Sequence, residues 1–170
     1  IVRLCAKGDE RAQRAVYDLL SPKMYPVCLR YAGDRDSAMD ILQDGFITLF
    51  GKIDSFRGDG SFEGWARRIF VTTALMNLRK RDIFRNAEEL DSASGEVNFS
   101  PEIFDKLSAA DLMKIIKSMP DGFRTVFNLY VIEGYSHQEI GEMLKISDSS
   151  SRSQLSRART WLQNKLKAEG

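Results

Sequence analysis

The stretch 135–159 constrains the fold of this chain more than any other, because its pattern predicts two helices joined by a tight turn. Ser136 and Glu139 have the S-x-x-E spacing of a capping box, so the first helix begins there. Residues 145–147 form the turn, and a second helix begins at Ser147 or Asp148. Its apolar residues recur at helical spacing and make one stripe: Leu155, Ala158, Leu162 and Leu166. The pattern is typical of a helix-turn-helix.

Short polar side chains and an arginine lie opposite this apolar stripe: Ser149, Ser150, Ser153, Gln154 and Arg157. Short polar groups near a helix N-terminus, followed by arginine, can reach base edges in the major groove while cations hold phosphates. The alternative is an ordinary helical hairpin with a solvated outer face, since look-alikes of this motif are common. Ser151 lies on the apolar stripe itself. We expect its hydroxyl to be at least partly buried and bonded to a main-chain carbonyl one turn earlier.

The net charge of +1 conceals an uneven distribution of charge. Residues 1–85 hold 15 Lys and Arg against 11 Asp and Glu, residues 86–105 hold none against 6, and residues 106–170 hold 10 against 7. The middle strip contains Ser, Gly and Pro with little periodicity, which indicates a linker; an exposed loop inside one domain is the alternative. We therefore predict an all-α chain of two small helical domains, 1–85 and 106–170, joined by an acidic flexible linker at 86–105.

The first domain begins with two predicted helices. Residues 9–32 form one helix, interrupted near Pro22 and Pro26. Its expected core residues are Ala12, Ala15, Val16, Leu19 and Leu20. Residues 36–53 form the second helix, which has a wide apolar side.

The other side of the 36–53 helix carries an acidic face, defined by Asp36, Asp40, Gln43, Asp44 and Ile47. Neither Asp40 nor Asp44 has a cation three or four residues away, and like charges at that spacing weaken a helix. A solvated face gains nothing from an exposed Ile beside unpaired carboxylates, whereas a docking surface for a basic partner would use both. We therefore favour docking over a plain solvated face.

A third helix, predicted from about Ser61 to Arg81, is apolar on two sides and leaves a narrow basic strip, defined by Arg67, Arg68, Thr72 and Arg79. Such a strip is suited to phosphate. The Gly-rich loop 54–61 before it contains Phe56 and Arg57, and Trp65 follows. Aromatic rings and Arg can stack on or clamp unpaired bases, although core packing is the alternative for these rings and for Phe62.

The sequence offers no constellation for catalysis. Cys5 and Cys28 are the only cysteines and His137 is the only histidine, so neither a metal site of the usual kind nor a disulfide framework is expected. No Gly-rich phosphate loop opens a helix, and we expect neither a cofactor nor an enzyme. We expect no signal peptide, and the sequence contains no apolar run that could span a bilayer, so we expect a cytoplasmic protein without membrane insertion.

Five motifs follow one another along the chain: Asp36-x3-Asp40-x2-Gln43-Asp44-x-Phe46, Phe56-Arg-Gly-Asp-Gly-Ser-Phe-x2-Trp65-x2-Arg68-Ile69, Met119-Pro-x2-Phe-Arg-x-Val-Phe127, Ser136-x2-Glu139-Ile140 and Arg157-Ala-Arg159. Together they resemble the extracytoplasmic-function (ECF) group of bacterial RNA polymerase sigma factors. The resemblance covers nearly the whole chain in the right order, with a gap where the family has its linker. It implies a region-2-like helical bundle at 1–85 and a region-4-like helix-turn-helix domain at 106–170.

The resemblance also implies a role for each surface. The acidic face would dock on the clamp helices of the largest subunit of RNA polymerase core enzyme. The loop 55–61 would capture a base turned out of the melted strand, and the minus-ten promoter element would contact Phe56, Arg57, Ser61, Trp65, Arg67, Arg68, Thr72 and Arg79. The minus-thirty-five element would contact Ser149, Ser150, Arg152, Ser153, Gln154 and Arg157.

A sigma factor of this group would direct promoter recognition, promoter melting and transcription initiation, under the control of an anti-sigma factor. The chain departs from the family at Ser150-Ser151, where Thr-Val is usual, and at Gln154, where a basic residue often occurs. The alternative is a stand-alone helix-turn-helix transcriptional regulator. Such a protein would explain residues 106–170, but it would have no use for the acidic face or the basic strip.

Overall fold

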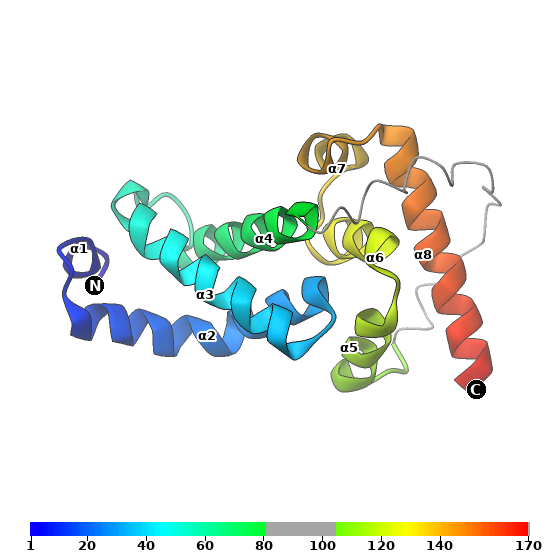
Figure 1. Cartoon of the computed structure of the whole chain (residues 1–170), viewed down its shortest axis with the longest axis horizontal. Helices are drawn as coiled ribbons and strands as arrows, with labels where there is room; N and C mark the ends of the chain where they lie inside the picture. Colours follow the sequence, from blue (N-terminus) through cyan, green and yellow to red (C-terminus); the bar gives the residue numbers. More distant parts are fainter. Residues whose placement is uncertain (81–104, 170) are drawn as a thin grey trace. The chain divides into compact units, whose positions relative to one another are not determined.

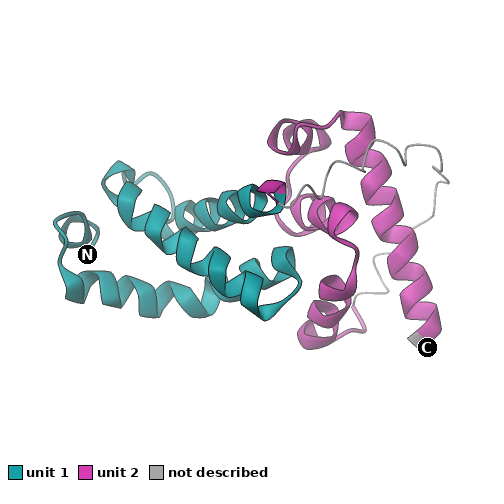
Figure 2. Cartoon of the chain, in the orientation of Figure 1, with its two compact units in different colours: residues 1–78 teal, residues 79–170 magenta. Residues whose placement is uncertain are grey.

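The computed structural model describes residues 1–80 and 105–169, and every regular element within them is a helix (Figure 1). This confirms the all-α prediction. The chain divides into two compact units, residues 1–78 and 79–170 (Figure 2). Of the expected linker 86–105, only Asp105 falls inside the described residues.

The first unit contains α1 (Val2–Ala6), α2 (Glu10–Ala32), α3 (Arg35–Lys52), the 3-10 turn η1 (Ile53–Ser55) and α4 (Phe62–Lys80). Side chains cap the two long helices at their N-termini. Asp9 accepts a bond from the amide of Ala12, and Asp34 accepts one from the amide of Ser37, each at 2.8 Å. The predicted helices at 9–32, 36–53 and from about Ser61 therefore form where the patterns placed them.

The predicted interruption of the first long helix near Pro22 and Pro26 is wrong, because α2 continues through both prolines. Its buried positions recur every four residues, at Ala12, Val16, Leu20, Met24 and Cys28. Pro22 lies on the exposed side, where water can bond the carbonyl that the missing amide leaves free. Ala15 and Leu19 were also expected in the core. The same helix rotation leaves Ala15 exposed and Leu19 58% exposed, so this expectation is wrong for both.

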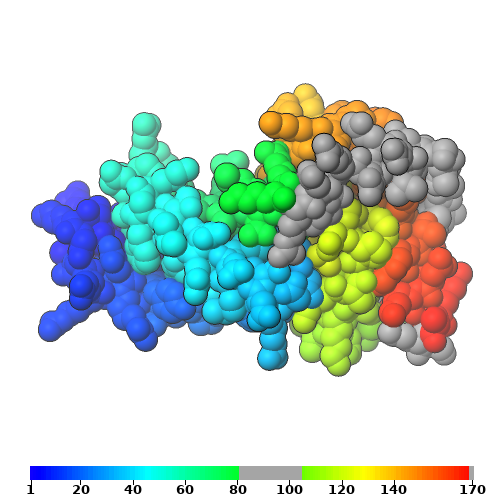
Figure 3. Space-filling model, viewed as in Figure 1, coloured from blue at the N-terminus to red at the C-terminus, as the bar shows by residue number. Residues whose placement is uncertain are grey.

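In the first unit, the Phe70 ring of α4 packs directly on Gly45 of α3. A Cβ on Gly45 would lie 2.3 Å from ring carbons of Phe70, so only glycine leaves room for this ring. The neighbouring Phe46 meets Phe70 edge-on at 5.0 Å between centroids, and it contacts Tyr17 of α2 at 4.6 Å. With this side of α3 buried, its opposite side faces outward; α3 is visible in cyan at the surface of the unit (Figure 3).

The second unit contains α5 (Ala109–Ser118), α6 (Asp121–Phe127), a π-helical turn η3 (Asn128–Ile132), α7 (His137–Leu144) and α8 (Asp148–Glu169). Arg124 is only 3% exposed and holds the end of α5 against α6. Its guanidinium donates to the carbonyls of Lys117 and Met119, at 3.1 and 3.0 Å, and pairs with Asp121. The buried charge therefore satisfies carbonyl groups that the end of α5 leaves without partners.

The predicted helix-turn-helix is present at α7 and α8. The Ser136–Glu139 capping box opens α7. Lys145 then takes the left-handed conformation, with φ of 57°, and the amide of Ile146 donates to the carbonyl of Gly141 at 3.0 Å. A Cβ on Gly141 would come within 2.7 Å of the Ile146 carbonyl oxygen, so the turn closes only over glycine.

Two glycines of α3 provide a matched test of the contact between α3 and α4. We expect Gly45→Ala to destabilise the first unit by about 1–3 kcal/mol, because the added methyl overlaps the Phe70 ring. Gly51→Ala meets no atom within 4 Å and should stabilise the same helix by up to about 1 kcal/mol. Urea unfolding in a Trp161→Phe background, where Trp65 reports on the first unit alone, measures both changes. Equal effects of the two substitutions would contradict the close approach.

Candidate functional site

All five residues of the acidic face are exposed on α3, and Ile47 is 72% exposed. Asp36 lies in the first turn of α3, where a carboxylate also favours the helix. Asp40 and Asp44 gain nothing from that position, and neither forms an ion pair with any residue that the structure describes. Met39 adds a second apolar side chain to this surface at 41% exposure. Met39 was not among the predicted residues, although it lies one turn before Gln43.

The basic strip is accessible along α4. Arg68, Thr72 and Arg79 are exposed, and Arg67 is half-buried. The two predicted apolar sides of this helix are covered, and its buried residues are Ala66, Phe70, Val71, Ala74, Leu75 and Leu78.

Three aromatic rings cluster where the Gly-rich loop meets α4. Phe56 lies 5.3 Å from both Phe62 and Trp65, and the last two are 5.6 Å apart. All three side chains are half-buried, so they pack on one another and keep part of their surface accessible. The loop itself needs glycine, because Gly58 and Gly60 have φ of 82° and 80°.

The remaining two residues predicted for this loop differ in their bonding. Arg57 is exposed. Ser61 is exposed too, but its hydroxyl accepts a bond from the amide of Gly64 at 3.2 Å and so caps α4.

The outward side of α8 is narrower than the sequence predicted. Ser149 and Arg152 are exposed, and Ser153 and Arg157 are half-buried. The expectation that Ser150 and Gln154 lie on this side is wrong, because each is only 4% exposed.

Both buried side chains have neighbours within the second unit. The Ser147 hydroxyl donates to that of Ser150 at 3.0 Å, beside the start of α8. The Gln154 side chain lies against Gly122 of α6. Its amide oxygen is 3.8 Å from the point where a Cβ on Gly122 would stand. Helices α6 and α7 both pack on α8, so the covered sector of α8 is wider than its apolar stripe.

A histidine–serine contact joins the two helices of the helix-turn-helix. Ser151 is fully buried, as expected. The main-chain partner expected for its hydroxyl is wrong, because the hydroxyl oxygen lies 2.8 Å from Nδ1 of His137. The His137 ring also stacks on Tyr130, with 4.4 Å between centroids. Burial lowers the pKa of His137, and the nearby Arg152 and Arg159 lower it further, against an opposing effect of Asp148.

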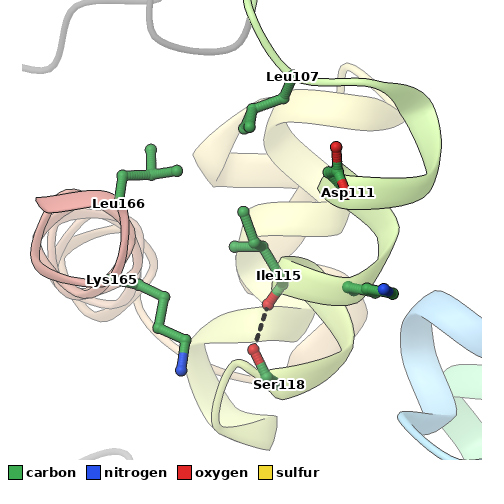
Figure 4. A pocket seen from close by; sticks show the side chains of 7 residues that line it. Leu107, Asp111, Ile115, Ser118, Lys165 and Leu166 are labelled. Atoms are coloured by element: carbon green, nitrogen blue, oxygen red, sulfur yellow. Dashed lines mark hydrogen bonds between the residues drawn. The ribbon is translucent and has the colours of Figure 1, made fainter. Parts of the chain in front are cut away.

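Other features of the described residues carry no predicted site. A hollow of about 530 Å³ lies between α5 and the last turns of α8, lined by residues that include Asp111, Lys165 and Leu166 (Figure 4). No group of His, Cys, Asp and Glu in the described ranges could hold a metal ion. Burial raises the pKa of Cys28 to about 12. Among the helices of 1–80 and 105–169, none is long and apolar enough to cross a membrane.

Family comparisons assign a class to each of the two units. The model of sigma-70 region 2 matches residues 16–83, and that of sigma-70 region 4 matches residues 109–162. The fold and these matches define a sigma-70-type transcription initiation factor. The chain is 31% identical over 179 residues to the ECF RNA polymerase sigma factor SigW of Bacillus subtilis, covering 98% of this chain and 95% of that protein. The chain therefore belongs to the ECF RNA polymerase sigma factors, and the resemblance seen in the sequence is confirmed.

Two further relatives agree with this assignment. The RNA polymerase sigma-H factor of Pseudomonas aeruginosa is 29% identical over 175 residues, covering 94% of this chain and 88% of that protein. Among solved structures, the sigma factor RpoE in complex with the anti-sigma factor NepR from Bartonella quintana matches 92% of this chain and 98% of its own. Its TM-score is 0.54 at 22% identity, so this likeness concerns the fold.

His137 permits a direct test of the helix-turn-helix contact, because it is the only histidine in the chain. We expect its imidazole NMR signal to titrate below the ordinary pKa of 6.5 in the folded chain and near that value in urea. The unfolded chain then binds the proton more readily, so stability is full above pH 6.5 and falls as pH drops toward the folded pKa. A folded midpoint at or above that of the unfolded chain would contradict the described environment.

Proposed function

We propose that this chain, acting in the cytoplasm and without catalytic activity of its own, directs RNA polymerase to promoters, helps to melt them and starts transcription. The observation that carries the proposal is the pairing of two outward surfaces on one helical unit. One is an acidic face on α3 whose Asp40 and Asp44 have no described counter-ion, and the other is the basic strip on α4. A protein that only binds DNA has no use for the first surface.

Residues 1–85 would form the domain that binds core polymerase and the minus-ten element. Asp36, Asp40, Gln43, Asp44 and Ile47, joined by Met39, would contact the clamp helices of the largest subunit. The carboxylates would orient a basic partner there. The exposed side chains of Ile47 and Met39 would be buried in the interface.

The basic strip and the aromatic loop would hold the melted minus-ten strand. Arg68, Thr72 and Arg79 are open to solvent for phosphate contacts, with Arg67 at the edge. The half-buried rings of Phe56 and Trp65 would stack on a base that has left the duplex, beside Arg57 and Ser61.

Residues 106–170 would bind the minus-thirty-five duplex through α8. The accessible side chains for that role are Ser149, Arg152, Ser153 and Arg157. Ser150 and Gln154 are buried and are not assigned base contacts. The acidic segment 86–105 would connect the two domains. A sigma factor of similar fold is found bound to an anti-sigma factor, and we propose such a regulator for this chain too.

In vitro transcription tests this function directly. The full chain, mixed with bacterial RNA polymerase core, should select active promoters from a randomised DNA library and yield run-off transcripts from them. Core enzyme alone should yield none. The chain would be a stand-alone regulator instead if it bound specific DNA in the absence of core and did not increase the run-off transcripts made by core.

Charge reversal separates docking from folding. We expect Asp40→Lys with Asp44→Lys to weaken binding to core polymerase by more than ~100-fold, because like charges facing each other across an interface cost several kcal/mol. Folding should be unchanged, since both side chains are exposed. The matched control is Glu10→Lys with Asp18→Lys, which makes the same charge change on the exposed side of α2. Fluorescence titration of labelled chain with core measures both, and equal affinities for the two variants would remove the docking surface.

Substitutions in the two DNA-binding surfaces should impair different steps of transcription initiation. Arg68→Ala should impair promoter melting more than initial binding, because α4 would contact the melted strand, and Arg157→Ala should do the reverse. Each lost phosphate contact should also reduce the salt slope of binding by roughly 0.7–0.9. Permanganate footprinting beside a salt titration distinguishes the two effects. Equal melting defects in both variants would count against this division.

A further inference from the structure

The contact between His137 and Ser151 lies next to the side of α8 that is proposed to bind DNA. His137 is the first residue of α7, and Ser151 lies near the start of α8. Ser151 is fully buried, and its hydroxyl oxygen is 2.8 Å from Nδ1 of His137. The next residue, Arg152, is exposed and is one of the proposed minus-thirty-five contacts. A charge on the His137 ring would therefore act close to the DNA-facing side of α8.

The surroundings of the His137 ring disfavour a proton on it in the free chain. Burial is the largest cause of its lowered pKa, and Arg152 and Arg159 of α8 act in the same direction, against Asp148 of the same helix. Of the two cations, Arg152 is the more open to solvent, so a bound anion can reach it.

The other neighbours of the ring contribute packing and a helix cap. Both α8 and η3 pack on α7, and from η3 the ring of Tyr130 stacks on the imidazole at 4.4 Å between centroids. On α7 itself, the Glu139 carboxylate accepts a bond from the amide of Ser136 at 3.3 Å and so caps its own helix.

A hydroxyl group at position 151 suits both protonation states of the histidine. Toward a neutral ring nitrogen it can donate or accept, and toward a protonated ring, whose two nitrogens both donate, it can accept. Val, which the family usually has here, offers no acceptor. Ser151 therefore lets His137 gain a proton without losing its buried partner, since an unpaired buried polar group is costly.

DNA binding would change the charge balance at the ring. A duplex phosphate on Arg152 would cancel much of the repulsion that this arginine exerts on a proton at His137. Such coupling is reciprocal, so a protonated ring would also strengthen the attraction of α8 for phosphate. We propose that the His137–Ser151 pair couples proton uptake to recognition of the minus-thirty-five duplex, so that mild acidification strengthens promoter binding by this chain.

This inference rests on the proposed function, because it needs α8 to contact the duplex. It makes His137 a positioning residue that acts through Ser151 and Arg152. The sign follows from linkage: if DNA raises the pKa of His137 above its value in the free chain, the complex binds more protons than the separate partners. Affinity then rises as pH falls through the pKa of the complex, and it levels off below that of the free chain.

The test compares Ser151→Thr with Ser151→Val in full-length chains assembled with core polymerase. The two new side chains have nearly the same shape, but only Thr keeps the hydroxyl that a charged ring needs. The probe is a labelled duplex of a promoter selected by the wild-type holoenzyme, kept cold so that it does not melt. Between about pH 7.5 and pH 6, we expect the affinity of the wild type and of Ser151→Thr to rise about 2–5-fold relative to that of Ser151→Val. His137→Gln should follow Ser151→Val.

Calorimetry in two buffers of different ionisation enthalpy counts the protons directly. The wild-type holoenzyme should take up a fraction of a proton more than the His137→Gln holoenzyme when it binds the promoter. Thermal unfolding of each free chain at both pH values verifies that folded chains are being compared.

Equal pH profiles for Ser151→Thr and Ser151→Val, with promoter binding intact, would overturn the coupling and leave the function standing. A wild-type affinity that falls on acidification relative to His137→Gln would overturn it too, because the proton would then oppose binding. If the wild-type holoenzyme selects no promoter, the proposed function fails along with the coupling.

Discussion

The packing of Phe70 over Gly45 is the constraint on which the first unit depends. Because position 45 has no side chain, the Phe70 ring of α4 can lie directly on the backbone of α3. The contact turns Gly45 of α3 and Phe70 of α4 toward each other. It turns the acidic face of α3 and the basic strip of α4 outward, and the apolar residues between them fill the core. Two chemically distinct surfaces thus lie opposite the sides of α3 and α4 that face the core.

The second unit is held together in a different way. Its helices are short apart from α8, and buried polar groups supplement its apolar core. Arg124 satisfies the end of α5, and the His137–Ser151 contact joins α7 to α8. Polar contacts of this kind have directional requirements, and they specify one arrangement of neighbouring helices. They also occupy part of α8, which leaves its outward side narrower than the spacing of its polar residues suggests.

Local patterns in the sequence predicted most of the fold, because periodicity and capping depend on neighbouring residues. The Ser136–Glu139 capping box and the burial of Leu155, Ala158 and Leu162 are as predicted. The failures concern properties that distant segments decide. Whether a proline interrupts α2 depends on which side faces the core, and the burial of Gln154 depends on α6. At the candidate site, exposure of the acidic face and most of the basic strip was foreseen, whereas the exposed Met39 beside the acidic face was not.

We propose that α3 and α4 present separate surfaces to polymerase and to promoter DNA. Site-specific photo-crosslinking tests it most directly, with a benzophenone side chain placed at Ile47 or at Thr72, both of which are exposed. In open complexes on a selected promoter, the probe at Ile47 should crosslink to the largest polymerase subunit and the probe at Thr72 to the non-template strand. Crosslinks from Ile47 to DNA, or from Thr72 to polymerase alone, would contradict the account.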